Sequence, residues 1–148
     1  MEGPQAVTML LAIGLQESGF ATRRQYGNGP ARGLWQFELG TQAGKGGIWG
    51  IYLHSASREH LRALCGKRGV VFEPGAIYRQ LEHDDVLAAA CARLLLWTDP
   101  APLPELGSPA ASWNLYARTW RPGKPHPEKW PSNYAKALEV VRWASGQG

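Results

Sequence analysis

A single acidic side chain, Glu17, stands near the end of a largely apolar stretch that covers residues 4–20. Leu10, Ile13 and Gly14 precede it at helical spacing, so these four positions share one face of the predicted helix. A carboxyl group held against apolar side chains resists ionisation, so its pKa rises and it can donate a proton near neutral pH. The pattern therefore predicts a general acid. It is equally compatible with a carboxylate that lies in water at a frayed helix end.

Two short motifs further along the chain accompany this glutamate. Residues 17–20 read ESGF, residues 33–36 read GLWQ, and residues 113–114 read WN. In this order they resemble the signature of the soluble lytic transglycosylases and their goose-type lysozyme relatives. That signature runs Glu-Ser-x-Phe, Gly-Leu-Met-Gln and Ala-Tyr-Asn, and a late tyrosine, matched here by Tyr134, completes it. The set covers most of the chain and is more similar to phage-encoded members than to bacterial cell-wall recyclers.

The resemblance implies a lysozyme-like fold and cleavage of the β-1,4 bond between N-acetylmuramic acid and N-acetylglucosamine in peptidoglycan. Glu17 would act first as acid and then as base, so that the muramyl C6 hydroxyl closes a 1,6-anhydro ring without water. Ser18 matches the motif serine and would support the orientation of Glu17. Tyr134 would hydrogen-bond Glu17 or the substrate. No cofactor is implied.

Amide and indole side chains in the same motifs are the expected substrate contacts. Gln36 and Asn114 carry amide groups suited to the N-acetyl and hydroxyl groups of a sugar. Asparagine is a poor choice inside a helix, so Asn114 is the notable residue of its segment. Trp35 stands where the family has methionine, and Trp113 stands where it has tyrosine. Both departures bear on the shape of the sugar subsites.

A second carboxyl group keeps a hydrolytic mechanism open. If Glu38 faced the cleft about 6.5–9.5 Å from Glu17, it would activate water, and the protein would be an inverting muramidase. Residues 30–38 are predicted to form a short helix, on which positions two apart point in roughly opposite directions. We therefore expect Gln36 to face the sugar and Glu38 to be a structural acid.

Charge and composition bear on the number of domains, on the expected partners and on a non-enzymatic alternative. The chain has 148 residues, a net charge of +4 and seven tryptophans, which fits one domain over residues 1–148 with an affinity for polyanions. Peptidoglycan is the expected partner, and other phage virion proteins are a second candidate. A virion docking subunit that kept only the fold is the non-enzymatic alternative. A nucleic-acid interface is not expected, because the 16 basic residues are dispersed.

Cys65 and Cys91 lie in apolar helical patterns and are predicted to be buried free thiols. The cysteines and histidines lack metal-ligand spacing, so no metal site is expected. No apolar run approaches the length of a membrane span, and no signal peptide is recognisable at the start. The expected location is a phage virion, or the host cytoplasm before delivery to the periplasm and cell wall.

The elements that must position these residues are mainly α-helices, six or seven in number. Arg23 and Arg24 lie in a basic loop, where they either pair with carboxylates at the cleft mouth or lie in solvent. Residues 40–53 are glycine-rich and read as an irregular loop or a small β-hairpin around residues 44–53. The remaining helices are predicted from their caps and apolar stripes over residues 57–65, 74–82, 84–97, 108–120 and from Ser132 onward.

Overall fold

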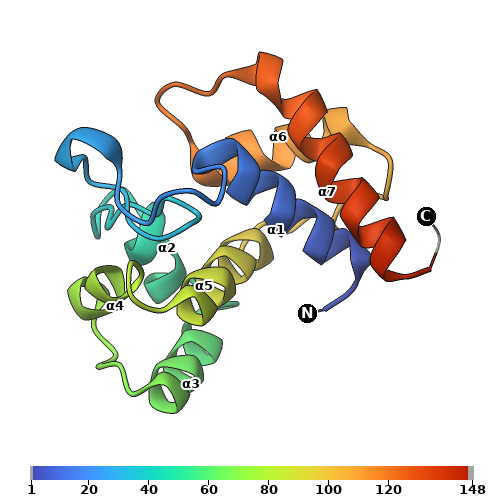
Figure 1. Cartoon of the computed structure of the whole chain (residues 1–148). Helices are drawn as coiled ribbons and strands as arrows, with labels where there is room; N and C mark the ends of the chain where they lie inside the picture. The colour runs from blue at the N-terminus through green and yellow to red at the C-terminus, as the bar shows by residue number, and fades with distance from the viewer. Residues whose placement is uncertain (1, 147–148) are drawn as a thin grey trace.

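Helix α1 (Pro4–Glu17) lies between α5 (Asp85–Trp97) and α7 (Trp130–Ala144) in the computed structural model, which describes residues 2–146 (Figure 1). The other helices of this part of the chain are α2 (Gly47–Leu53), α3 (Arg58–Arg68), α4 (Pro74–Gln80) and α6 (Pro109–Trp120). Two short 3-10 turns occupy Tyr26–Asn28 and Pro127–Lys129. The prediction of a mainly α fold with six or seven helices is confirmed.

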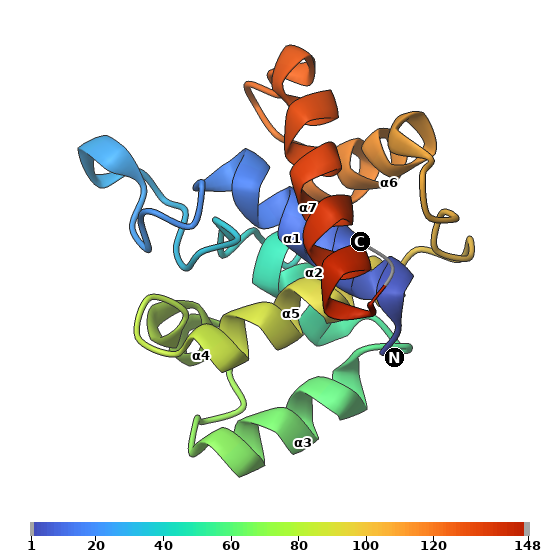
Figure 2. The same ribbon diagram turned by 45° about the vertical axis from the view of Figure 1, so that its right-hand side comes forward.

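Helix α5 is the centre of the hydrophobic core. It contacts α1, α2, α3 and α6, and Figure 2 shows it running beneath α1 with α3 and α4 on its far side. Seven of its side chains are buried: Leu87, Ala88, Cys91, Ala92, Leu94, Leu95 and Leu96. Helix α7 covers the opposite side of α1 and runs antiparallel to it (Figures 1 and 2). Cys65 and Cys91 are buried free thiols in this core, as predicted.

Most predicted helix ends agree with the structure because local chemistry fixes them. Pro4, Pro74 and Pro109 begin their helices, where a missing N–H costs nothing. The Asp84 carboxylate accepts a hydrogen bond from the Leu87 N–H at 3.0 Å and so caps α5.

Four predictions about secondary structure are wrong. Helix α1 ends at Glu17 instead of Phe20, and α7 begins at Trp130, so Ser132 lies within its first turn instead of capping it. Residues 47–53 form helix α2, neither an irregular loop nor the predicted β-hairpin. Ile48 and Ile51, three residues apart, are both fully buried, and this burial stabilises a helix that its glycines disfavour.

The predicted helix over residues 30–38 is instead a tight turn. Arg32 and Phe37 exchange both backbone hydrogen bonds, at 2.8 and 2.9 Å, and form an isolated antiparallel bridge. Gln36 closes the turn in the left-handed region with φ of 51°. These pairings replace the i to i−4 bonds that a helix would need.

The C-terminal end of α1 is fixed by the Phe20 ring, which lies directly on Gly14. A side chain at Gly14 would overlap this ring. Phe20 in turn packs edge-to-face against Trp35 in the turn, with centroids 5.5 Å apart. The absence of a side chain at Gly14 therefore allows the first motif to contact the second.

Replacing Gly14 by alanine should destabilise the protein by about 1–3 kcal/mol, because the added methyl group must displace Phe20. The matched control is Gly66→Ala in α3, where nothing lies within 4 Å of the new methyl group. That change should raise stability by about 0.5–1 kcal/mol through helix propensity. Urea unfolding of both variants tests this, and equal effects at the two glycines would contradict it.

Candidate active site

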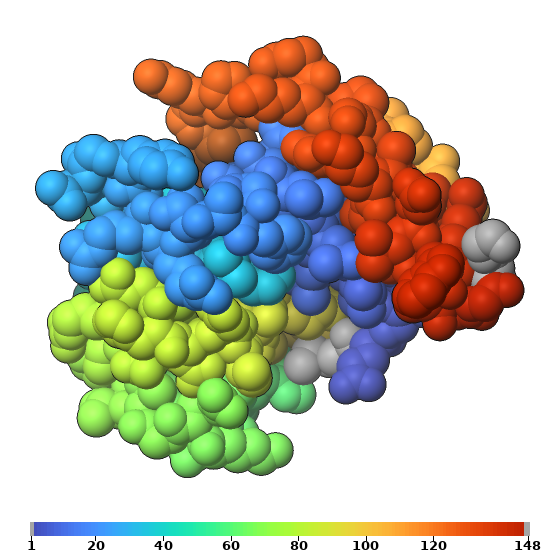
Figure 3. Space-filling view, in the orientation of Figure 1, coloured from blue at the N-terminus to red at the C-terminus, as the bar shows by residue number. Residues whose placement is uncertain are grey.

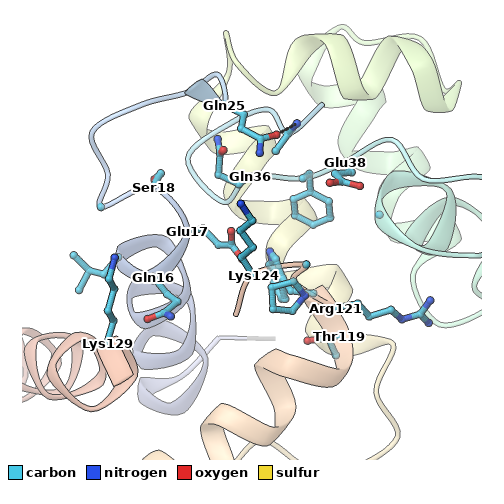
Figure 4. A pocket seen from close by; sticks show the side chains of 18 of the residues that line it. Gln16, Glu17, Ser18, Gln25, Gln36, Glu38, Thr119, Arg121, Lys124 and Lys129 are labelled. Carbon is cyan, nitrogen blue, oxygen red and sulfur yellow. Dashed lines mark hydrogen bonds between the residues drawn. The ribbon is translucent and has the colours of Figure 1, made fainter. Parts of the chain in front are cut away.

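A cleft of about 1150 Å³ separates the end of α1 from the loop at residues 121–129, here called the rim loop. The space-filling view shows the rim loop, in orange, overhanging the blue segment that follows α1 (Figure 3). Glu17, Ser18, Gln36 and Glu38 line the cleft on one side. The end of α6, the rim loop and the start of α7 line the other side, and the close-up shows side chains from both sides facing one space (Figure 4).

Glu17 lies at the last position of α1, half-buried in the wall of the cleft. The Tyr116 hydroxyl, which projects from α6, donates a hydrogen bond of 2.5 Å to Glu17 Oε1. Because Oε1 already accepts this bond, a proton on the carboxyl group resides on the other oxygen, Oε2. The arrangement thus holds an acidic proton away from Tyr116.

Burial raises the pKa of Glu17 to about 7. The hydrogen bond from Tyr116 opposes this rise because it stabilises the carboxylate, while the negative charge of Glu38 adds to it. The same contact and the same burial raise the pKa of the Tyr116 phenol above its ordinary range, so it remains a donor. Glu17 can therefore exist in both protonation states at neutral pH, unlike a carboxylate that lies in water at a frayed helix end.

Ser18 ties the first motif to the second. Its hydroxyl donates a hydrogen bond of 2.6 Å to the Leu34 carbonyl at the tip of the turn, and it accepts one of 3.1 Å from the Phe20 N–H. The Trp35 indole N–H donates to the Leu10 carbonyl of α1 at 2.8 Å. Ser18 thus lies in the cleft wall beside Glu17. Its two hydrogen bonds hold the end of α1 against the turn at residues 32–37.

Gln36 and Glu38 both line the cleft, contrary to the expectation that only one could. That expectation assumed a helix, whereas residues 32–37 form a tight turn in which Gln36 takes the left-handed conformation, so helical spacing does not apply to them. Gln36 donates from Nε2 to the Gly33 carbonyl at 2.9 Å, which leaves its side-chain carbonyl for other contacts. Glu38 is exposed. Glu17 and Glu38 therefore share the cleft, and Glu128 of the rim loop is a third carboxyl group in its lining.

Two predicted substrate contacts lie elsewhere. Tyr134 is buried under α6, where its hydroxyl accepts a hydrogen bond of 3.1 Å from the Gly107 N–H, so it contacts neither Glu17 nor the cleft. Asn114 is exposed on α6 and is not among the residues that line the cleft. It lies two residues before Tyr116, and these positions point to different faces of a helix.

The two tryptophans predicted to shape sugar subsites belong to the core instead. Trp35 is 7% exposed, and its backbone carbonyl accepts a hydrogen bond of 3.0 Å from the Trp120 indole. Trp113 packs against Tyr116 and Trp130 at centroid distances of 5.3 and 5.7 Å. Neither lines the cleft, whereas Trp120 does.

The functional residue that sequence reasoning missed is Tyr116. Its signal was present in the spacing, because Ser112, Tyr116 and Thr119 recur on one face of the helix at four and three residues. That face contains the buried side of α6, and Thr119 reaches the cleft. The Tyr116 hydroxyl lies on the buried face of α6 and hydrogen-bonds Glu17, whereas the Tyr134 hydroxyl bonds to Gly107.

The rim loop is held in place by Gln16, the neighbour of Glu17. Gln16 Nε2 donates to the carbonyls of Pro125 and His126 at 3.0 Å each, and Gln16 Oε1 accepts from Asn133 of α7 at 2.9 Å. One side chain therefore fixes the rim loop to the C-terminal end of α1.

The opposite wall is held by ion pairs. Arg23 binds Asp85 through two hydrogen bonds of 2.8 and 2.7 Å, and Arg24 binds Glu82 through two of 3.0 and 2.6 Å. Both arginines pair with carboxylates, as one of the two alternatives predicted. The pairs attach residues 22–26 of the cleft wall to the start of α5.

Two other features, a metal site and a membrane-spanning helix, are absent from residues 2–146. Within residues 2–146, no three His, Cys, Asp or Glu side chains converge as a metal site would require. No helix in this part of the chain is both long and apolar enough to span a bilayer. Comparison with known protein families, curated proteins and solved structures found no significant match. The function must therefore be argued from the geometry of the cleft.

The raised pKa of Glu17 predicts a pH-dependent stability. The folded protein binds the Glu17 proton more tightly than the unfolded chain does. The resulting contribution to the free energy of unfolding is complete below pH 4.5 and is lost as the pH rises through about 7. Glu17→Gln should therefore be more stable than the wild type at pH 8, by up to about 3 kcal/mol, with a smaller difference at pH 5. Urea unfolding at both values measures this.

The matched control is Glu139→Gln, which removes the same charge from an exposed position on α7. It should give no such gain at pH 8. A Glu17→Gln variant that gained nothing between pH 5 and pH 8 would show that Glu17 is ionised normally.

Proposed function

We propose that this protein is a peptidoglycan-cleaving lytic transglycosylase with a lysozyme-like fold, encoded by a phage and acting as an endolysin or a virion-associated enzyme. The observation that carries the proposal is the half-buried Glu17 carboxyl group, bonded to Tyr116 and facing a large cleft with a pKa of about 7. The motif resemblance supports the same reaction, and the volume of the cleft is suited to a glycan strand.

Glu17 would begin the reaction as a general acid. Its Oε2 proton passes to the oxygen that links muramyl C1 to the N-acetylglucosamine that leaves, and the C1–O bond breaks. The muramyl C1 becomes oxocarbenium-like and is stabilised by the resulting Glu17 carboxylate. Tyr116 donates to Oε1 throughout, so it favours the charged form at the moment that form is made.

The same carboxylate would then complete the reaction as a base. It accepts the proton of the muramyl C6 hydroxyl while O6 bonds to C1, which closes the 1,6-anhydro ring and restores the protonated acid. A pKa near the working pH suits a group that must both give and take a proton. The Gln36 side-chain carbonyl is placed to accept a hydrogen bond from the sugar.

A hydrolytic muramidase is the second candidate, because Glu38 lines the same cleft as Glu17. In that mechanism Glu38 removes a proton from water, and the water oxygen bonds to C1 in place of O6. The two mechanisms differ in the product, since only hydrolysis leaves a reducing end.

Mass spectrometry of the soluble fragments from purified peptidoglycan separates these candidates. We expect the wild type to release fragments that end in anhydro-muramic acid, each lighter than a hydrolysis product by one water. Glu17→Gln should lower release by at least about 100-fold, the lower bound for loss of a general acid. Glu38→Gln, the matched control, should keep most of the activity.

Other outcomes have defined meanings. If the wild type releases fragments with reducing ends and Glu38→Gln is inactive, the transglycosylase mechanism is wrong and the protein is a hydrolytic muramidase. An absence of fragments from the wild type would favour a virion docking subunit that retains the fold without the reaction.

Tyr116→Phe should move the pH dependence of cleavage. Because the hydrogen bond from Tyr116 lowers the pKa of Glu17, its loss should shift the alkaline fall in activity to higher pH. Tyr134→Phe removes a hydroxyl that contacts Gly107 instead and should leave the profile in place. Initial rates from pH 5 to pH 9 test the pair, and identical profiles for both variants would contradict a role for Tyr116.

A further inference from the structure

A second, smaller cavity of about 400 Å³ adjoins the cleft. It lies where α2 and the C-terminal ends of α5 and α6 meet. Four residues line both spaces: Gly46, Leu95, Thr119 and Arg121. A ligand in the cleft could therefore extend into the smaller cavity past Arg121.

Unpaired positive charge distinguishes this cavity. Lys45, Arg118 and Arg121 line it, and Asp99 is the one acid among its lining residues. Arg118 already holds Asp99 through hydrogen bonds of 2.7 and 3.1 Å. Within residues 2–146, no carboxylate lies within 4.0 Å of the charged groups of Lys45 or Arg121. Two cations therefore remain for an anion.

Arg121 stands at the junction of the two spaces. It follows α6 in the left-handed conformation, with φ of 50°, and its Nη1 donates a long hydrogen bond of 3.4 Å to the Gly44 carbonyl across the opening. A guanidinium group has five N–H donors, so this bond leaves most of them for a ligand. The guanidinium fork matches the geometry of a carboxylate.

His54 supplies a further donor to the cavity wall. Its Nδ1 accepts a hydrogen bond of 3.0 Å from the Ala56 N–H, so the neutral ring carries its proton on Nε2. The lining thus combines two unpaired cations with a neutral N–H donor, and it offers little to a cationic or purely apolar ligand.

We propose that this cavity binds a carboxylate of the peptide attached to the muramyl sugar, with Arg121 and Lys45 as its ligands. The inference rests on the proposed function, because the sugar must lie in the cleft for its peptide to reach the cavity. The volume lies in the range of small-molecule sites and is sufficient for a short peptide segment. The protein would accordingly favour peptide-bearing strands over bare glycan.

Cleavage of peptide-bearing peptidoglycan is compared with cleavage of the same strands after an amidase has removed the peptides. Arg121→Gln and Lys45→Gln should each lower kcat/KM on the peptide-bearing substrate by about tenfold, mainly through KM, as expected for loss of a charged hydrogen bond. Cleavage of the stripped strands should not change in Lys45→Gln, because Lys45 lines the smaller cavity and not the cleft. Lys67→Gln, which removes an exposed charge from α3, is the matched control.

Equal losses on both substrates would overturn the inference and assign Arg121 to stabilisation of the end of α6. No loss on either substrate would overturn it as well. A wild type that cleaves neither substrate would instead contradict the proposed function.

A binding measurement separates these failures without turnover. The Glu17→Gln protein is titrated by NMR with the muramyl tetrapeptide and with its counterpart in which every carboxylate is an amide. Shifts at the amides of Gly46, His54 and Arg121 with the acidic probe alone would support the site. Shifts with both probes, or with neither, would refute it.

Discussion

The hydrogen bond between Tyr116 and Glu17 joins two residues that are 99 positions apart in the chain, and the rest of the candidate site depends on it. Burial alone would keep the carboxyl group neutral and inert as a base, while full exposure would leave it charged and inert as an acid. The phenol balances these tendencies from the buried face of α6. The packing of α1, α5, α6 and α7 therefore sets a proton affinity as well as a shape.

Neutral hydrogen bonds to backbone carbonyls keep this arrangement rigid. Ser18 binds the Leu34 carbonyl, Trp35 binds the Leu10 carbonyl, and the Trp120 indole binds the carbonyl of Trp35. The first two bonds attach the turn at residues 32–37 to α1 and the residue after it, and the third attaches the turn to α6. The indole side chains of Trp35 and Trp120 therefore hold these segments together, and Gln36, Glu38 and the rim loop line the open cleft.

The fold was predictable wherever a local rule operated. Proline at a first turn and Asp84 at a cap located the helices, and the apolar stripe of α5 identified the core. Long-range contacts decided what local rules could not. Gln36 takes a left-handed conformation because Arg32 and Phe37 pair across it, and α2 forms because Ile48 and Ile51 are buried.

The site was predictable in part for the same reason. Glu17, Ser18 and Gln36 lie at the cleft because their motifs are short and locally folded. Tyr134 was preferred to Tyr116 because sequence motifs do not reveal which face of a helix meets the acid. That choice depends on how α6 is rotated against α1, which only the packed core determines.

The two walls of the cleft are built from different forces, and salt acts on them unequally. Exposed ion pairs at Arg23 and Arg24 hold one wall, and dissolved ions screen such pairs. Uncharged hydrogen bonds from Gln16 hold the rim loop, and ionic strength leaves them largely unaffected. A dilute medium therefore keeps both walls fixed, whereas a concentrated one loosens only the wall that follows α1, so the cleft would widen from one side.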